Sequence, residues 1–159
     1  MLRESITIEF ATKLDANEIG ALSQEYIEYG LGWRYTPRKI RSLISDGAKN
    51  VVVAREGGKL AGFGIMTYRE ENANLDLLAV KARYRRNGVG TQIVDWLEEV
   101  ATIAGIQNVF VQVRETNHNA IMFYRKLNFH KIDEHTGYYK GQETGVIMCK
   151  AIRSIFNAT

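Results

Sequence analysis

The sequence predicts a single α/β domain. Short β-branched runs alternate along the chain with stretches of helical periodicity, and this alternation is typical of α/β architecture. The chain has 159 residues, which suits one ordinary domain and is too short for two. Apolar residues make up 45% of the chain, enough to build a buried core. We expect the domain to span residues 1–151, and residues 152–159 to form a C-terminal tail.

The N-terminal part predicts a strand followed by a helix. Residues 6–10 alternate in polarity, which favours a strand. Asp15 and Glu18 have the spacing of a capping box, so we expect the helix to begin beside them. Gly30 and Gly32 then end it. The apolar face of this helix comprises Ile19, Leu22, Tyr26 and Tyr29.

A second, short helix and a hairpin come next. Thr36 suits the N-cap of this helix and Pro37 its first position, where a missing N–H costs nothing. The β-branched run at residues 51–54 favours a strand. Gly57–Gly58 then allows a tight turn into a partner strand at 59–68.

The second half predicts four strands and two helices. A strongly amphipathic helix ends at Gly105, and Asn117 can cap the helix after it. We expect the last two strands to pair. The expected elements, in order, are a strand at 72–81, a helix at 89–104, a strand at 109–113, a helix at 120–127, and strands at 129–135 and 144–150.

Composition narrows the function. The net charge is +3, from 21 basic and 18 acidic residues. The sequence has no basic stripe with interleaved aromatics, so we expect no nucleic-acid partner. No apolar run reaches the roughly 18 residues that a membrane span requires, and the first residues lack the apolar stretch of a signal peptide. Cys149 is the only cysteine and His is sparse, which argues against a disulfide or a metal site. We therefore expect a cytoplasmic protein, with Cys149 as a small buried hydrophobe.

The most informative motif is Arg85-Arg86-Asn87-Gly88-Val89-Gly90, which follows a strand and opens the long helix. Its glycines expose backbone N–H groups, the positive end of the helix dipole adds to them, and Arg83 is nearby, so the motif suits a pyrophosphate. It lacks the Gly-Lys-Ser/Thr ending of a P-loop. The third glycine of a dinucleotide site would fall at Ile93. A plain loop is the alternative interpretation.

Three segments together resemble the GNAT (GCN5-related N-acetyltransferase) superfamily, over residues 74–150. Arg85-x-x-Gly88-x-Gly90 resembles its pyrophosphate loop. Val113-Arg114-Glu115-Thr116-Asn117 with Ala120-Ile121 resembles the segment that contacts pantetheine, and the run 123–129 resembles the end of its fourth helix. The resemblance implies a mixed, mostly antiparallel sheet of about seven strands flanked by four helices, with a splayed strand pair that forms an acyl-CoA slot. Asn128 stands where the family usually has Gly, and Asn is tolerated at a left-handed helix end.

The resemblance also implies acetyl-CoA as the acyl donor, with CoA as product. The backbone of one strand would pair with the pantetheine arm, the glycine loop would hold the pyrophosphate, Asn117 would bind the arm and Tyr124 would stand near the sulfur. The implied donor-binding residues are Leu78, Ala79, Val80, Arg85, Arg86, Asn87, Gly88, Val89, Gly90, Thr91, Asn117 and Tyr124.

The chemistry needs an acid for the thiolate and a base for the amine. Tyr124 is the candidate acid, and a tyrosine at the edge of the core is the alternative. Relatives that acetylate protein N-termini often carry a Glu where Gln112 stands, and Gln cannot accept a proton. Asp76 is the candidate base, expected on the strand face of Leu78 and Val80. A water relay stays open. Weaker candidate bases are Glu70 and Glu115.

The acceptor is less defined. Trp33, in the loop between the first two helices, and Tyr138-Tyr139, in the last hairpin, are candidate acceptor-binding residues. Packing or surface roles are the alternatives. The amine is a protein N-terminus or a small molecule, and a homodimer stays open. The alternative function is an inactive acyl-CoA-binding sensor or interaction module, which the Gln at 112 favours and the intact Tyr124 and Asn117 disfavour.

Overall fold

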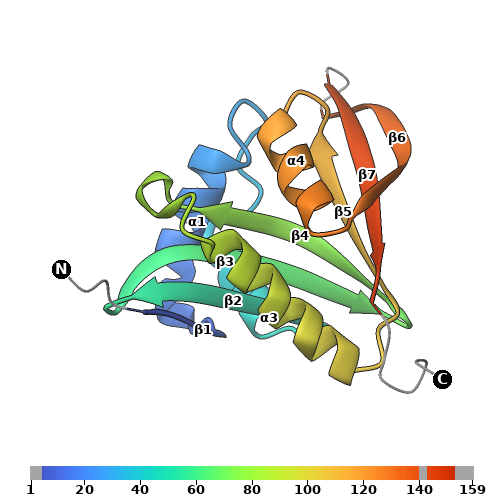
Figure 1. Ribbon diagram of the computed structural model, residues 1–159. Helices are drawn as coiled ribbons and strands as arrows, with labels where there is room; N and C mark the ends of the chain where they lie inside the picture. The colour runs from blue at the N-terminus through green and yellow to red at the C-terminus, as the bar shows by residue number, and fades with distance from the viewer. Residues whose placement is uncertain (1–4, 140–142, 153–159) are drawn as a thin grey trace.

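A computed structural model describes residues 5–139 and 143–152 (Figure 1). Within them the chain forms seven strands and four α-helices, which confirms the predicted fold class and element order. The elements are β1 (Ile6–Phe10), α1 (Ala16–Tyr26), α2 (Pro37–Ile44), β2 (Lys49–Glu56), β3 (Lys59–Arg69), β4 (Asn72–Val80), α3 (Val89–Ile103), β5 (Asn108–Arg114), α4 (His118–Lys126), β6 (His130–Tyr139) and β7 (Glu143–Ala151), with 3-10 turns at Lys13–Asp15 and Ala82–Tyr84.

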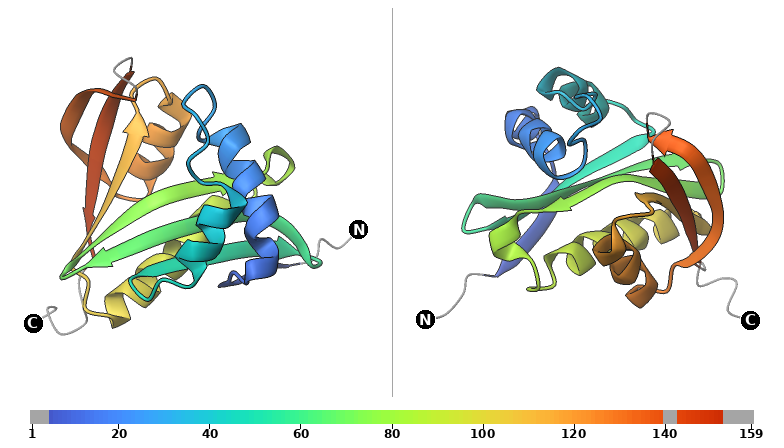
Figure 2. Two further views of the ribbon diagram at one scale, coloured as in Figure 1. Left: turned by 180° about the vertical axis from the view of Figure 1, so that it is seen from behind. Right: turned by 90° about the horizontal axis from the view of Figure 1, so that it is seen from above.

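The strands form one sheet in the order β1-β2-β3-β4-β5-β7-β6. Among the described strands, β4 and β5 make the one parallel pair, and all other neighbours are antiparallel. Helices α1 and α2 cover one face of the sheet and α3 and α4 cover the other, as Figure 2 shows from above. Each pair of helices buries its own apolar core against the sheet.

The sheet opens between β4 and β5. Their pairing starts at Asn72–Asn108 and stops at Leu75–Val111. Beyond that point β4 stays paired with β3 as far as Val80, and β5 stays paired with β7 as far as Arg114. The two strands therefore diverge, which confirms the splayed pair that the family resemblance implies (Figure 1).

A β-bulge at Asp76 changes which face of β4 each side chain occupies. Ile65 pairs with Leu77 and Met66 with Leu75, so Asp76 is an extra residue in β4. Leu75 consequently packs in the α3/α4 core, whereas Leu77 packs in the α1/α2 core. The prediction that Asp76 shares the face of Leu78 was wrong: its carboxylate bonds the side chain of Asn74, on the α1/α2 face.

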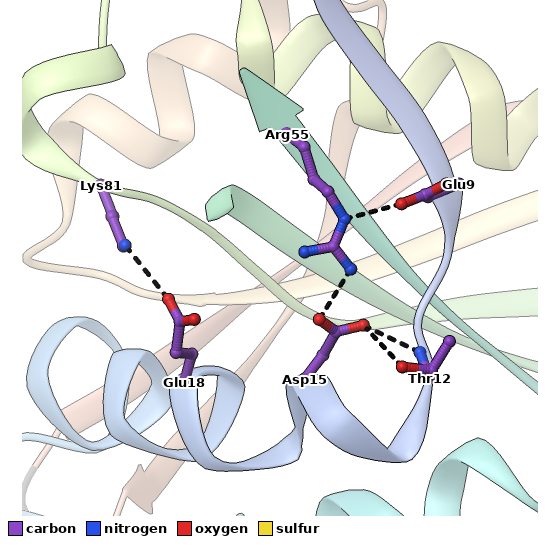
Figure 3. Close-up of polar contacts among 6 residues, drawn as sticks. All are labelled: Glu9, Thr12, Asp15, Glu18, Arg55 and Lys81. Atoms are coloured by element: carbon purple, nitrogen blue, oxygen red, sulfur yellow. Dashed lines mark hydrogen bonds and ion pairs between the residues drawn. The ribbon is translucent and has the colours of Figure 1, made fainter. Parts of the chain in front are cut away.

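Helix α1 is anchored differently from the prediction. Asp15 is the N-cap residue of α1, as predicted, but it forms no capping box with Glu18. Its carboxylate accepts the Thr12 N–H at 2.8 Å and so completes a capping box on the 3-10 turn before the helix. The other Asp15 oxygen lies 2.6 Å from a guanidinium nitrogen of Arg55 in β2 (Figure 3). Glu18 instead pairs with Lys81, just after β4, at 3.4 Å (Figure 3). These ion pairs fix α1 against the strand ends beside the site described below.

Other local predictions hold. Thr36 Oγ1 accepts the Lys39 N–H at the start of α2, and Asn117 Oδ1 accepts the Ala120 N–H at the start of α4. Asn128 has φ +72°, the left-handed conformation expected after α4. Ile152, assigned to the tail, is 8% exposed and its N–H donates to the Gln107 carbonyl, so the packed part of the chain reaches at least this residue.

Candidate active site

A cavity of about 530 Å³ lies where β4 and β5 diverge. Its walls come from the loop between α1 and α2, the middle of β4, the end of β5 and the first turns of α4. The cavity therefore reaches the loop between α1 and α2 on one face of the sheet and α4 on the other. Predicted site residues that line it are Asp76, Leu78, Asn117 and Tyr124.

The edge of β4 offers backbone groups to this gap. The Lys81 N–H donates to the Ala61 carbonyl at 2.8 Å, so the alternation of an antiparallel pair turns the backbone groups of Ala79 toward β3. The N–H and C=O groups of Leu78 and Val80 then point away from β3, toward the diverging strand. Of the three predicted backbone contacts, Leu78 and Val80 are placed to meet a ligand, and Ala79 is not.

The glycine loop has the conformation of an anion site. Gly88 is the N-cap of α3, with φ +77°, and Arg86 also has a positive φ of 66°. The N–H groups of the first turn of a helix, here from Val89 to Thr91, have no intrahelical acceptor. No side chain caps α3 in their place. They lie at the positive end of the helix dipole. The local geometry that the motif predicts is present.

Gly90 is required for packing as well as for the loop. A Cβ atom at this position would lie 3.2 Å from Cζ of Phe123 in α4. The absent side chain therefore lets the start of α3 approach α4 closely. This contact places the glycine loop beside the helix that carries Tyr124.

The arginines of the loop point in different directions. Arg85 lies over the Tyr26 ring of α1, 4.9 Å from its centroid, and its Nε donates to the Val80 carbonyl at 3.1 Å. Arg83 lies over its neighbour Tyr84. Arg86 and Asn87 are exposed at the tip of the loop. The loop thus presents Arg86 at its tip, while Arg85 joins the loop to α1.

Tyr124 is buried in the wall of the cavity. It is 5% exposed, and its ring makes edge contacts with Phe123 and Phe129, with centroids 5.1 Å and 5.4 Å away. Burial raises the pKa of the Tyr124 hydroxyl well above its ordinary value. The hydroxyl therefore stays protonated at neutral pH and can donate a proton.

Asp76 faces the cavity from the bulge. Its carboxylate accepts hydrogen bonds from Thr67 Oγ1 and from Asn74 Nδ2, the latter at 2.7 Å, and Lys49 Nζ lies 4.0 Å away. It is half-buried. The weaker candidate bases lie elsewhere: Glu70 in the β3–β4 turn and Glu115 after β5 are exposed and are not among the residues that line the cavity.

Glu28 is a site residue that the sequence did not reveal. It is 7% exposed and lies in the loop between α1 and α2. Its carboxylate accepts the backbone N–H of Arg34 at 2.8 Å, the N–H of Tyr35 at 3.1 Å and the Ser23 hydroxyl at 3.0 Å. These bonds fold the loop around one buried carboxylate. Because two of the three partners are backbone N–H groups several residues away, no pattern of side chains in the sequence marks them.

Arg114 is the second residue that sequence reasoning undervalued, since it was noted only as part of a motif. It is 8% exposed at the end of β5. Its Nη2 donates to the carbonyls of Ile27 and Tyr29 at 2.7 Å and 3.1 Å, and Nη1 lies 3.3 Å from Glu143 Oε2 in β7. One guanidinium therefore joins β5, β7 and the loop over the cavity.

The predicted acceptor residues fare differently. Trp33 donates from Nε1 to the Gly20 carbonyl at 3.0 Å and is not among the residues lining the cavity, so the structure does not bring it into the site. Tyr138 and Tyr139 end β6, and their side chains lie outside the described part of the structure. No group of three or more potential metal ligands occurs among the described residues. No helix among them is long and apolar enough to cross a membrane.

Comparisons with known proteins agree with this geometry. The chain is 30% identical over 100 residues to the ribosomal protein bS18-alanine N-acetyltransferase of Escherichia coli (strain K12), covering 61% of this chain and 68% of that protein. The crystal structure of Ard1 from Thermoplasma volcanium matches with a TM-score of 0.82 and 26% identity, over 92% of this chain and 97% of that one.

A third comparison concerns the fold alone. PaiA N-acetyltransferase from Thermoplasma acidophilum, solved in complex with coenzyme A, matches with a TM-score of 0.79 and 21% identity, over 93% of this chain and 99% of that one.

The model of the Acetyltransferase (GNAT) family matches residues 18–129. With the splayed sheet, the glycine loop and the buried tyrosine in place, this chain belongs to the GNAT family of acetyltransferases.

Proposed function

We propose that the protein transfers an acetyl group from acetyl-CoA to a primary amine, by direct attack of the amine in a ternary complex. One observation carries this proposal. A single cavity joins the open edge of β4, Tyr124 and the loop between α1 and α2. A thioester arm along β4 and an amine beneath the loop would meet inside it.

The residues present fit acetyl-CoA, which supplies an acetyl group activated as a thioester. The backbone groups of Leu78 and Val80 would pair with the amides of the arm, as a further strand would. The N–H groups at the start of α3 would bind the pyrophosphate. Asn117 uses Oδ1 to cap α4, so its contact with the arm falls to Nδ2.

We assign two roles to the chain's own groups. Tyr124, whose buried hydroxyl is protonated at neutral pH, would give its proton to the departing sulfur. Asp76 would attract the ammonium form of the acceptor and take its proton, directly or through water. Glu28 also lines the cavity, but two of its bonds are to backbone N–H groups that fold the loop, which suits a structural anion better than a base, whereas the partners of Asp76 among the described residues are all side chains.

The names of the relatives support a protein N-terminus as the acceptor. One acts on the alanine of a ribosomal protein, and an N-alpha-acetyltransferase of Saccharolobus solfataricus is 30% identical over 76 residues, which cover 46% of its length. A small amine is the other acceptor class that the sequence leaves open. Gln112, where such relatives often carry Glu, favours a second candidate function, an acyl-CoA-binding module without turnover.

The release of free thiol tests the proposal. Protein and acetyl-CoA are mixed with an alanine-initiated peptide, a polyamine or an amino acid. Thiol release that requires an amine and falls in Tyr124→Phe supports the enzyme. Coenzyme A binding by calorimetry without turnover on the whole panel supports the module. Absence of both binding and turnover contradicts the two candidates together.

A further inference from the structure

The charged residues that line the cavity are Glu28, Arg34, Asp76 and Arg114. Three of them have hydrogen-bond partners in the fold, since Glu28 accepts from loop amides, Asp76 accepts from neighbouring side chains and Arg114 donates to loop carbonyls. Arg34 differs from these. Its backbone N–H is bonded, but within residues 5–139 and 143–152 its guanidinium makes no hydrogen bond, ion pair or ring contact. Arg34 is therefore a cation that a ligand in the cavity can use.

The backbone around Arg34 is held in place. Its N–H donates to Glu28 Oε1 at 2.8 Å, and the N–H of Tyr35 donates to Glu28 Oε2 at 3.1 Å. On the other side, Trp33 Nε1 donates to the Gly20 carbonyl in α1 at 3.0 Å. An arginine on a loose loop would lose backbone freedom when it binds a ligand, whereas here only the side chain has to be ordered. The loop thus presents Arg34 to the cavity from a fixed position.

The charges of the cavity suit a ligand that carries both signs. Asp76 lines the cavity from β4, and Arg34 lines it from the loop between α1 and α2. An acceptor amine arrives as an ammonium ion, which the carboxylate attracts and the guanidinium repels. A carboxylate on the same acceptor offsets that repulsion, because a guanidinium can bind it with two parallel N–H groups. A polyamine has only positive charges, so none of its groups matches Arg34.

We propose that Arg34 binds a carboxylate of the acceptor and thereby selects amines that carry an acidic group. The inference rests on the proposed acetyl transfer and narrows it. The acceptor is a carboxylated amine, such as a peptide with an acidic second residue or a free amino acid, and not a polyamine. These two sources offer the same chemistry to Arg34, and the experiment separates them.

Matched pairs of acceptors measure the contribution of the carboxylate. The first pair is a peptide amide that begins with alanine and glutamate and its counterpart with glutamine in place of glutamate. The second pair is alanine and alaninamide. The wild-type protein should favour the acidic member of one pair by about fivefold in kcat/KM, as a partly exposed ion pair predicts. A preference within the first pair identifies a peptide, and a preference within the second identifies a free amino acid.

Variants of Arg34 connect this preference to the guanidinium. In Arg34→Gln the ratio of kcat/KM between the acidic and the neutral acceptor should fall to about one, because the carboxylate loses its partner. Arg34→Glu should invert the preference. The fold should persist, since the side chain is exposed and the backbone bond to Glu28 is kept. Arg38→Gln, which changes an exposed arginine of α2 outside the cavity lining, should retain the wild-type preference.

Several results would overturn the inference. The wild-type protein could fail to distinguish the members of either pair, the preference could persist in Arg34→Gln, or this variant could lose the same factor with both members of a pair. A rise in the KM for acetyl-CoA that is equal with every acceptor would assign Arg34 to the donor, and would overturn the inference as well.

Failure of the proposed function gives a different result. If the wild-type protein acetylates none of the four compounds, transfer to these amines is rejected, and calorimetry with the protein–coenzyme A complex then tests Arg34 alone. Tighter binding of an acidic member by the wild-type protein, lost in Arg34→Gln, supports the carboxylate site. Equal affinities within both pairs, or no binding by the wild-type protein, overturn it.

Discussion

The guanidinium of Arg114 lies over the ring of Tyr29, 4.1 Å from its centroid, and also donates to the Tyr29 carbonyl at 3.1 Å. Tyr29 is 51% exposed at the mouth of the cavity. One residue of the loop between α1 and α2 is thus held twice by a side chain from the sheet. The helix predicted to include Tyr29 ends at Tyr26, which frees the loop carbonyls to accept these bonds.

Replacement of Arg114 should therefore loosen the loop between α1 and α2. In Arg114→Gln, and also in Arg114→Lys, the planar fork that joins two carbonyls and Glu143 is lost. We expect the acceptor KM to rise by about tenfold or more, with the KM for acetyl-CoA nearly unchanged. Hydrogen exchange at residues 27–35 should accelerate. Arg125→Gln, which changes an exposed arginine of α4, is the control. Unchanged hydrogen exchange in Arg114→Gln would contradict the role of Arg114 in holding the loop.

Tyr124→Phe tests the proposed acid. The variant keeps the buried ring and its contacts with Phe123 and Phe129, so coenzyme A affinity should change little. The turnover number should fall by about 10²-fold or more, because the proton donor for the sulfur is lost. A variant with wild-type turnover would remove Tyr124 from the mechanism.

The pH dependence gives an independent measure of Tyr124. Burial raises its pKa, so the protonated, active form persists above the ordinary pKa of tyrosine. The wild-type rate should rise as the amine loses its proton and should not decline as pH approaches about 10. Because the folded-state pKa is raised, the stability that this group contributes is complete below the unfolded pKa and is lost as pH rises through the folded value. Tyr124→Phe should show less alkaline loss of stability, and an identical loss would contradict the assignment.

Two glycines provide a matched test of the pyrophosphate loop. Gly88 and Gly58 have φ of +77° and +79°, and a Cβ on either would meet no atom within 4 Å. Gly88→Ala and Gly58→Ala should therefore lose similar stability, about 1 kcal/mol, from backbone strain alone. Calorimetry with coenzyme A should show weaker binding in Gly88→Ala and unchanged binding in Gly58→Ala, which alters only the β2–β3 turn. Equal affinities would place the ligand elsewhere.

A buried ion pair joins α3 to β7. Lys150 Nζ lies 2.9 Å from the Glu98 carboxylate, whose side chain is 11% exposed. Burial raises the pKa of Glu98, and the bond to Lys150 partly offsets it. Lys150→Met leaves the carboxylate unpaired and should destabilise the fold by about 1–3 kcal/mol at pH 7.

The sign of its pH dependence follows from the raised pKa. The stability linked to Glu98 is complete below its unfolded pKa and declines as pH rises through the folded pKa. The loss of folding free energy in Lys150→Met should therefore be largest at neutral pH, where the carboxylate is charged. Urea unfolding should show a smaller difference from wild type at pH 4 than at pH 7. Glu98→Leu combined with Lys150→Met should recover most of the loss. A difference that is equal at both pH values would exclude Glu98 as its source.

Local patterns predicted the elements, because periodicity, caps and glycine stops act within a few residues. The cap at Asn117 and the left-handed Asn128 are examples. The bulge at Asp76 was missed, since it arises from the register between β3 and β4 and not from the sequence of β4 alone. Asp15 was paired with Glu18 in a capping box because Glu18 had suitable spacing, whereas its actual partners are Thr12 and, far along the chain, Arg55.

In the candidate site, too, the features set by nearby residues could be predicted and those set by distant residues could not. Its proposed donor half rests on a local motif at 85–90 and one tyrosine, so the sequence alone was sufficient to predict it. Its acceptor half is built from distant residues that meet only in the fold: Glu28 bonds loop amides, and Arg114 bonds loop carbonyls. Trp33, chosen for its size in that loop, instead bonds the backbone of α1.

The bond from Arg85 to the Val80 carbonyl has a consequence for self-association. A sheet that opens between two strands exposes unpaired backbone groups in its middle, and such groups are templates for strands of other chains. Arg85 occupies one of these acceptors, and its stacking on Tyr26 fixes it there. Arg85 thus covers one acceptor in the opening of the sheet, and a strand of another chain that paired there would first have to displace a guanidinium stacked on Tyr26 of α1.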